Sequence, residues 1–183
     1  MYPILKIRYL LFLFFLNACD SEVNNLNIND KNLALANGVM YYKNMPYSGT
    51  LSSKIDTLIV NRITYLNGKK HGKEQKFFFN GELAAVRFYT DGKKSGTHKG
   101  WWDNGQLEFV YHFDDNGNQI GMQQEWYSNG QLAKEFNFTN GKEDGTQKKW
   151  DFKGKIIANY LVINGERFGL IGSINCKPDN YVD

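Results

Sequence analysis

Short runs of alternating apolar and polar side chains fill the chain from residue 73 to residue 169, and glycine-containing turns separate them. In one run the apolar side chains occupy every second position, at Leu107, Phe109, Tyr111 and Phe113. Polar residues such as Glu108 and His112 lie between them. A period of two predicts a β-strand with one apolar face. Asn-Gly pairs between the runs predict tight hairpins, because type I′ turns require positive φ at both central residues.

Three series of glycines recur at a nearly constant spacing. The first series has spacings of 24, 25, 24 and 24 residues and consists of Gly72, Gly96, Gly121, Gly145 and Gly169. The second series consists of Gly81, Gly105, Gly130 and Gly154. The third series consists of Gly68, Gly92, Gly117, Gly141 and Gly165. A fixed period of this length predicts a repeat array in which each unit is a strand, a turn, a second strand and a second turn.

The repeat predicts the fold class and the division of the chain into segments. We expect an all-β fold, an elongated antiparallel meander of stacked β-hairpin repeats, with about ten strands extending over about 50 Å. Residues 73–169 hold four repeats; residues 38–72 hold an N-terminal hairpin and a degenerate repeat whose turn, "SSKID", lacks Asn-Gly. The polar residues 19–37 are predicted to be a flexible tether. Residues 170–183 are predicted to form a C-terminal cap, where Pro178 suits a sheet edge.

The first residues of the chain have the features of a targeting segment. Lys6 and Arg8 precede the short apolar run "YLLFLFFL", which is too short to span a bilayer. The following "LNAC" resembles a bacterial lipobox, and this resemblance implies cleavage after residue 18 and lipidation of Cys19. We therefore predict a signal peptide at residues 1–18 and a lipid-anchored protein of the bacterial cell envelope, at the outer membrane or its periplasmic face. The alternative is a buried N-terminal strand with an incidental cysteine.

Composition and charge exclude some classes of partner. Cleavage after residue 18 removes two of the 22 basic residues and none of the 19 acidic ones, which leaves 20 against 19. Nucleic-acid binding requires a basic stripe, so no nucleic-acid partner is expected. With Cys19 lipidated, Cys176 has no partner within the chain, so we expect no internal disulfide and a small buried side chain at this position.

Neither the histidines nor the acidic turn residues form a strong metal motif. The chain has three histidines, His71, His98 and His112. A two-residue Asn-Gly turn places His98 opposite Tyr111 and His112 opposite Thr97, so these two rings would point to opposite faces, and all three histidines are expected in solvent. The segment "DDNGNQIG" faintly resembles a calcium loop, but its glycine is fourth, whereas an EF-hand loop needs it at position six. Turn chemistry explains this segment, and we predict no metal, no cofactor and no enzymatic activity.

Two rows of aromatic residues recur at equivalent positions. One row comprises Phe77, Trp101, Trp126 and Trp150, and the other comprises Phe78, Trp102 and Tyr127. A two-residue turn pairs Trp102 with Leu107, which places the second row on the apolar face and the first row on the opposite face. Both rows are explained by packing between repeats. The first row is also the candidate partner-binding surface, since tryptophan on a sheet face is a plausible hot spot.

The repeat resembles the MORN-repeat variant family. "FFFNGEL", "WWDNGQL" and "WYSNGQL", together with "YLNGKKHG" and "YTDGKKSG", carry the resemblance, which covers about residues 38–169. The last unit departs from the pattern, with Asp151 in place of the second aromatic and "FKG" in place of Asn-Gly. The family includes bacterial lipoproteins and YwqK-type antitoxins. The resemblance implies a β-hairpin array with a binding or scaffolding role and implies no reaction.

Three functions are compatible with these features. The first is a non-enzymatic, lipid-anchored module that binds or scaffolds an unidentified protein partner at the envelope. The second is an antitoxin or immunity protein that neutralises a toxin by direct binding, which a toxin gene next to this one would support. The third is envelope glycan binding through the first aromatic row, which a polysaccharide pulldown would test.

The lipobox resemblance generates a first prediction. Replacing Cys19 by serine is expected to abolish labelling by a radioactive or clickable fatty acid and to shift the protein out of the membrane fraction, because serine lacks the thiol that carries the lipid. Labelling that persists in Cys19→Ser would refute the lipobox.

Overall fold

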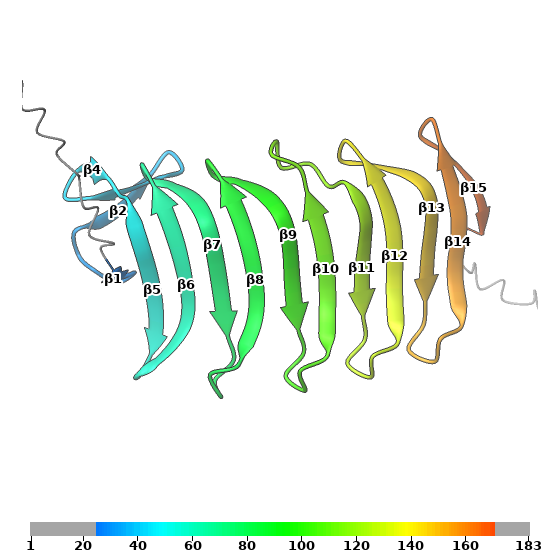
Figure 1. The fold of residues 1–183 in the computed structure, drawn as a ribbon, viewed down its shortest axis with the longest axis horizontal. Coiled ribbons are helices and arrows are strands. Elements are labelled where there is room, and N and C mark those ends of the chain that lie inside the picture. Colours follow the sequence, from blue (N-terminus) through cyan, green and yellow to red (C-terminus); the bar gives the residue numbers. More distant parts are fainter. Residues whose placement is uncertain (1–24, 171–183) are drawn as a thin grey trace, which may run out of the picture.

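The computed structural model describes residues 25–170 and consists of one long sheet and one small sheet (Figure 1). In the long sheet, β1 pairs with β5 in parallel, and β5 to β15 then follow in chain order, each antiparallel to the one before it. Its strands are β1 (Asn25–Asn27), β5 (Gly49–Ile55), β6 (Leu58–Leu66), β7 (Lys69–Phe77), β8 (Leu83–Thr90), β9 (Lys93–Trp101), β10 (Leu107–Phe113), β11 (Gly121–Trp126), β12 (Leu132–Thr139), β13 (Lys142–Trp150), β14 (Ile156–Ile163) and β15 (Glu166–Leu170). The predicted all-β meander of stacked hairpins is confirmed.

The small sheet lies at the N-terminal end and corrects the predicted tether. Its strands are β2 (Leu33–Ala36), β3 (Val39–Tyr42) and β4 (Met45–Pro46). The hairpin expected after residue 38 is therefore present, but residues 25–37 are folded and not a tether. The polar residues that suggested a tether form turns: the carboxylate of Asp30 accepts a hydrogen bond from the backbone N–H of Asn32 at 2.9 Å. Residues 1–24 and 171–183, with the predicted signal peptide, Cys19, Cys176 and most of the predicted cap, lie outside the described residues.

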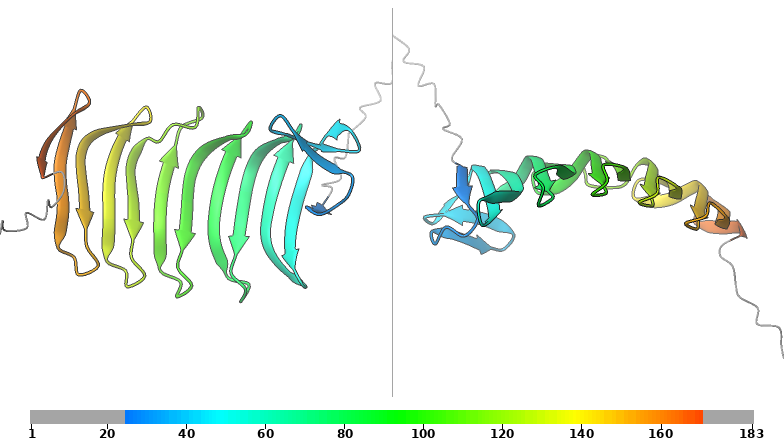
Figure 2. Two further views of the ribbon diagram at one scale, coloured as in Figure 1. Left: turned by 180° about the vertical axis from the view of Figure 1, so that it is seen from behind. Right: turned by 90° about the horizontal axis from the view of Figure 1, so that it is seen from below.

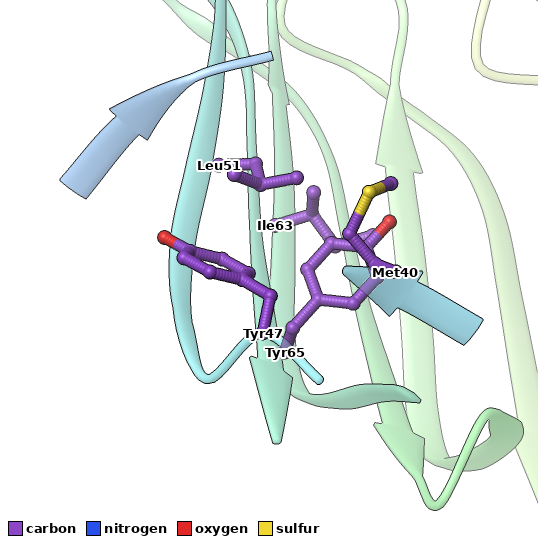
Figure 3. Packing of buried hydrophobic residues seen from close by; sticks show 5 residues of the cluster. All are labelled: Met40, Tyr47, Leu51, Ile63 and Tyr65. Atoms are coloured by element: carbon purple, nitrogen blue, oxygen red, sulfur yellow. The ribbon is translucent and has the colours of Figure 1, made fainter. Parts of the chain in front are cut away.

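A compact apolar cluster joins the two sheets. Met40, Tyr47, Leu51, Ile63 and Tyr65 are buried together, and Figure 3 shows them pointing toward one another from both sheets. Leu26 and Leu33, from the segment expected to be a tether, pack against this cluster. Beyond it the sheet is a single layer that arches along its length (Figure 2). The small sheet thus gives the N-terminal end of the array a two-layered core.

The turns of the sheet have two geometries, and only one is the expected type I′ turn. Four of the turns that contain the third glycine series have positive φ at both central residues, as at Asn140 (51°) and Gly141 (78°). In the turn before β11, only Gly117 has positive φ, and the N–H of Asp114 donates to the carbonyl of Asn118 at 3.0 Å. The turn after Trp102 is longer: the N–H of Trp102 donates to the carbonyl of Gln106 at 2.8 Å, and only Gly105 has positive φ. Here the side chain of Asn104 accepts the N–H of Gln106 at 3.1 Å, so the asparagine stabilises a wider loop.

The wider loop corrects the predicted pairing at the tryptophans. Leu107 lies opposite Trp101 and not opposite Trp102, because the ladder shifts register between Leu107 and Phe109. The same shift occurs in the next unit, where Leu132 lies opposite Trp126. Beyond the shift the predicted register is recovered, with Tyr111 opposite His98. Trp102 and its equivalents therefore belong to the loops and not to the paired strands.

A buried polar side chain recurs at the centre of the first strand of each unit. We call these four residues the polar ladder: Glu74, His98, Gln123 and Gln147, each at most 5% exposed. They lie where the sheet bulges. At one such bulge, Phe138 pairs with Glu143 but Phe136 pairs with Gln147, so three residues of β13 face Asn137 alone. Gly145, with φ of 79°, supplies the backbone conformation that this bulge requires.

The glutamines of the polar ladder complete the hydrogen bonding that the bulges interrupt. Gln147 Nε2 donates to the carbonyl of Asn137 at 2.8 Å, and Gln147 Oε1 accepts the N–H of Asn137 at 3.0 Å. Gln123 makes the same pair of bonds to the backbone of His112, at 3.1 and 2.9 Å. A glutamine amide has one donor side and one acceptor side, so it replaces the missing strand partner completely.

His98 occupies the equivalent position in its unit and is buried, which corrects the expectation that it lies in solvent. Its Nε2 is 2.8 Å from the carbonyl of Phe88. Burial lowers the pKa of His98, with Lys94 and Arg87 adding to the effect and the contact to Phe88 opposing it. The neutral ring is therefore favoured in the folded protein, and any contribution of this shift to stability is present above the usual histidine pKa and lost as pH falls below it.

The glutamine contacts generate a stability prediction. Replacing Gln147 by leucine keeps the size of the side chain but leaves the N–H and the carbonyl of Asn137 without partners, at a cost of about 2–4 kcal/mol in the free energy of unfolding. Urea unfolding followed by circular dichroism would measure it. Gln75→Leu is the control, since Gln75 is partly exposed and makes no hydrogen bond to another described side chain. Equal losses in the two variants would contradict this role of Gln147.

Candidate binding surface

The two faces of the sheet differ in the way predicted from the alternation. The packed face carries apolar residues from the second strands, of which the buried ones are Ala85, Phe113, Phe136, Ala158, Tyr160 and Val162. Lysine and arginine side chains cover several rings of this face. Lys134 Nζ lies 4.8 Å from the ring centroid of Phe136, and the guanidinium of Arg167 lies 5.3 Å from that of Tyr160. Cations thus shield a face that has no second layer over it.

The candidate partner-binding residues lie at the ends of the first strands. Phe77, Trp101, Trp126 and Trp150, the outer aromatic row, end β7, β9, β11 and β13, and all four are partly exposed. Each is three residues beyond the polar ladder, so strand alternation directs the row to the opposite face. Phe77 is covered by the guanidinium of Arg62, 5.7 Å from its ring centroid. The structure therefore places the row along one margin of the sheet, at the loops.

The second aromatic row links neighbouring units through hydrogen bonds. Trp102 Nε1 donates to the carbonyl of Trp126 at 2.9 Å, and the hydroxyl of Tyr127 donates to the carbonyl of Trp150 at 3.0 Å. Asparagine side chains of the same loops make parallel contacts, such as Asn104 Nδ2 to the carbonyl of Ser128 at 2.7 Å. These bonds, between residues 23 or 24 positions apart, fix the distance between successive loops.

The first loop of this series lacks the link. Phe78 has no polar atom in its side chain, and Asn80 donates to Glu82 of its own loop at 2.8 Å. No described side-chain hydrogen bond connects the loop of residues 78–82 with the next one. Two hollows, of about 350 and 590 Å³, lie between these loops. Both are lined by Phe78, Trp101, Trp102 and Asp103, and we call them together the Trp101 hollow.

The Trp101 hollow combines aromatic rings with carboxylates. Glu82 lines one part of it and Glu108 lines the other, in addition to Asp103. Among the described residues that line it, none is lysine, arginine or histidine. Rings and carboxylates both attract positive charge, so the chemistry of this hollow favours a cation over an anion.

In a smaller hollow one unit further along, the carboxylate is already paired with neighbouring side chains of the protein. It measures about 260 Å³ and includes Tyr111, Glu125 and Trp126. The hydroxyl of Tyr111 donates to Glu125 at 2.8 Å, and Lys134 contacts the same oxygen at 2.9 Å. Burial would raise the pKa of Glu125, but the hydrogen bonds from Lys134 and Tyr111 hold it below its usual value. Burial and the bond to Glu125 raise the pKa of Tyr111 well above its usual value, so this hollow keeps a fixed internal ion pair.

A further hollow, of the opposite charge, lies at the N-terminal end. It measures about 640 Å³ and is lined by Lys54, Arg62 and Lys73 among hydroxyl and amide side chains. The strand register explains it, because Asn27, Ser52, Arg62 and Gln75 lie side by side across four strands. The charge of this lining favours anionic over cationic groups. The alternation of the predicted repeats did not indicate this hollow, because the hollow includes residues of β1.

The remaining candidates for metal binding occupy structural positions. His112 Nδ1 lies 3.0 Å from the hydroxyl of Thr97 on the face opposite His98, as the predicted register requires, and His71 lies 3.5 Å from Asp91. Asp114 accepts hydrogen bonds from the side chain and N–H of Asn118, at 3.0 and 2.8 Å, and these bonds lower its pKa. Within residues 25–170, no three His, Cys, Asp or Glu side chains gather as a metal site.

No helix in the described part of the chain could cross a membrane.

Sequence reasoning missed the carboxylates of the hollow and the polar ladder. The ladder had a signal, because Glu74, His98, Gln123 and Gln147 recur with the period of the glycines on an otherwise apolar face. The carboxylates had none, since Glu82, Asp103 and Glu108 occupy three different positions of the unit. Only the contact between two loops brings them to one hollow.

Comparisons with known proteins identify the repeat. The model of the MORN repeat variant family matches residues 94–115 and 119–140, which cover two adjacent units from β9 to β12. No curated protein matches the chain. A crystal structure of a TarM mutant from S. aureus with fondaparinux, alpha-GlcNAc-glycerol and UDP is 15% identical at a TM-score of 0.33. That match covers 62% of this chain and 21% of the other, and at such a score it supports no inference.

The link between loops generates a stability prediction. Replacing Trp102 by phenylalanine removes the hydrogen bond to the carbonyl of Trp126 and is expected to lower the free energy of unfolding by about 1 kcal/mol. Thermal and urea unfolding would measure the loss. Trp101→Phe is the matched control, because the Trp101 indole makes no hydrogen bond to the described residues. A loss confined to Trp101→Phe, or none in either variant, would show that the link does not stabilise the array.

Proposed function

We propose that this protein is a non-enzymatic repeat module that binds a protein partner and holds it at the bacterial cell envelope. The match of two units to MORN repeats supports a repeat-based binding module. We extend that assignment to the flanking units because they share the glycine registers and the hairpin geometry. The lipobox-like "LNAC" supports the proposed anchor at Cys19.

The observation that carries the proposal is the Trp101 hollow. Elsewhere the sheet makes contacts within itself. Lysine and arginine cover rings of the packed face, glutamine side chains complete two of the bulges, and hydrogen bonds link the later loops. At the Trp101 hollow, the partly exposed Trp101 ring has no described cation over it, and Asp103 and Glu108 have no ion pair with a described residue. Tryptophan is enriched in the hot spots of protein interfaces, where a hollow lets it be desolvated on binding. The partner surface is therefore proposed to lie on Trp101 and its loop, and not along the whole outer aromatic row.

Site-specific photo-crosslinking tests this proposal. Phe79 is 68% exposed beside the hollow, and Phe152 is 54% exposed at the equivalent position of the last loop. We expect the photo-reactive residue p-benzoylphenylalanine in place of Phe79, in the native bacterium, to capture one discrete partner band. The same residue in place of Phe152 should not capture it.

A second variant links the captured partner to the hollow. Trp101→Ala in the Phe79-labelled protein should abolish the band, while Trp150→Ala should leave it. Thermal unfolding of each variant would show whether the fold is kept. Identical bands from both positions, or a band indifferent to Trp101→Ala, would overturn the proposed site, and the absence of any band in the native envelope would overturn the binding function.

A further inference from the structure

We propose that the Trp101 hollow binds an arginine side chain presented by the partner. This inference rests on the proposed function, because it names the group that the partner inserts. Three features support it: a similar arginine–ring contact within this protein, the charge of the residues that line the hollow, and the shape of the guanidinium.

The protein itself contains the arrangement one unit earlier. Arg62 lies over the ring of Phe77, with its guanidinium 5.7 Å from the ring centroid. Phe77 and Trp101 are equivalent residues, 24 positions apart, but the residue equivalent to Arg62 is Val86. The unit of Trp101 thus has the ring without the arginine.

The tryptophan rings of the hollow have no described cation over them, unlike several other rings of the protein. Described cation–π contacts involve the rings of Tyr42, Phe77, Tyr89, Phe109, Phe113, Phe136 and Tyr160. No described lysine or arginine lies over the ring of Trp101 or Trp102. Tryptophan is the ring that binds cations best. Trp126 and Trp150 also lack a described cation, but Trp101 and Trp102 are the two tryptophans that line one hollow together with Asp103.

Charge complementarity completes the site. Glu82, Asp103 and Glu108 line the hollow, and none of them forms an ion pair with a described residue. A cation that stacks on the indoles therefore meets carboxylates at the rim. Arginine suits both contacts better than lysine, because its flat guanidinium stacks on a ring and presents a fork of N–H donors to a carboxylate.

Titration with single amino-acid amides tests the inference. The chain has four tryptophans, each with one indole N–H signal in a ¹⁵N NMR spectrum, assignable by substitution. The full-length labelled chain, held in detergent, is titrated with N-acetyl-arginine amide. We expect the signals of Trp101 and Trp102 to move saturably, while those of Trp126 and Trp150 serve as internal controls and stay in place.

Two comparisons separate charge from shape. N-acetyl-citrulline amide has nearly the shape of the arginine compound without its charge, and it should leave all four signals in place. The double variant Asp103→Asn, Glu108→Gln should weaken arginine binding by about 2- to 20-fold, because exposed ion pairs of this kind are lost. Since Asp103 is exposed and Glu108 only partly buried, these changes test the charge without removing a ring. Equal shifts with citrulline, equal shifts at all four tryptophans or no shift would each overturn the inference.

The result is distinguishable from a failure of the proposed function. If the amide moves no signal but photo-crosslinking at Phe79 still depends on Trp101, the binding function stands and the arginine site is wrong. If neither experiment gives the expected result, both proposals are wrong.

Discussion

Every regular unit of the sheet bends at a bulge, and the backbone groups that the bulge leaves without a strand partner must find another one. In two units a buried glutamine supplies both hydrogen bonds, as Gln147 does for Asn137. An unpaired and buried peptide group costs as much as a hydrogen bond contributes, so these glutamines stabilise the two bulges that they complete. The curvature and spacing of the single layer depend on this contact.

A sheet one layer thick has little core, and the chain compensates for this differently along its length. At the N-terminal end, a second sheet covers Leu51 and Ile63 and encloses an apolar cluster. Along the array, rings of the packed face are covered by lysine and arginine stems instead. Near the loops, the indole of Trp102 and the phenol of Tyr127 bond to the next unit. The stability of the array is thus spread over contacts between neighbours, as expected of a repeat protein.

The proposed binding surface lies where the link between successive loops is absent. Phe78 replaces a residue with a polar atom, and the link to the next loop is lost. Val86 occupies the position of Arg62, so Trp101 lacks the cation that lies over its equivalent Phe77. Where this link is absent, rings and carboxylates line a hollow between the first two loops. A repeat protein can in this way acquire a site without any change of fold.

The period of the glycines and the alternation of side chains determined the fold from the sequence, because both follow from local backbone geometry. They predicted the meander, the apolar face and the opposite directions of His98 and His112. They gave a wrong prediction for residues 25–37, where Leu26 and Leu33 pack against core residues that are distant in sequence. They also gave a wrong prediction for the turn after Trp102, where the Asn104 side chain stabilises a wider loop. The burial of the polar ladder and the Trp101 hollow were decided by tertiary structure alone. Both depend on which side chains of neighbouring units come into contact after the strands shift register. A local sequence pattern does not predict these contacts.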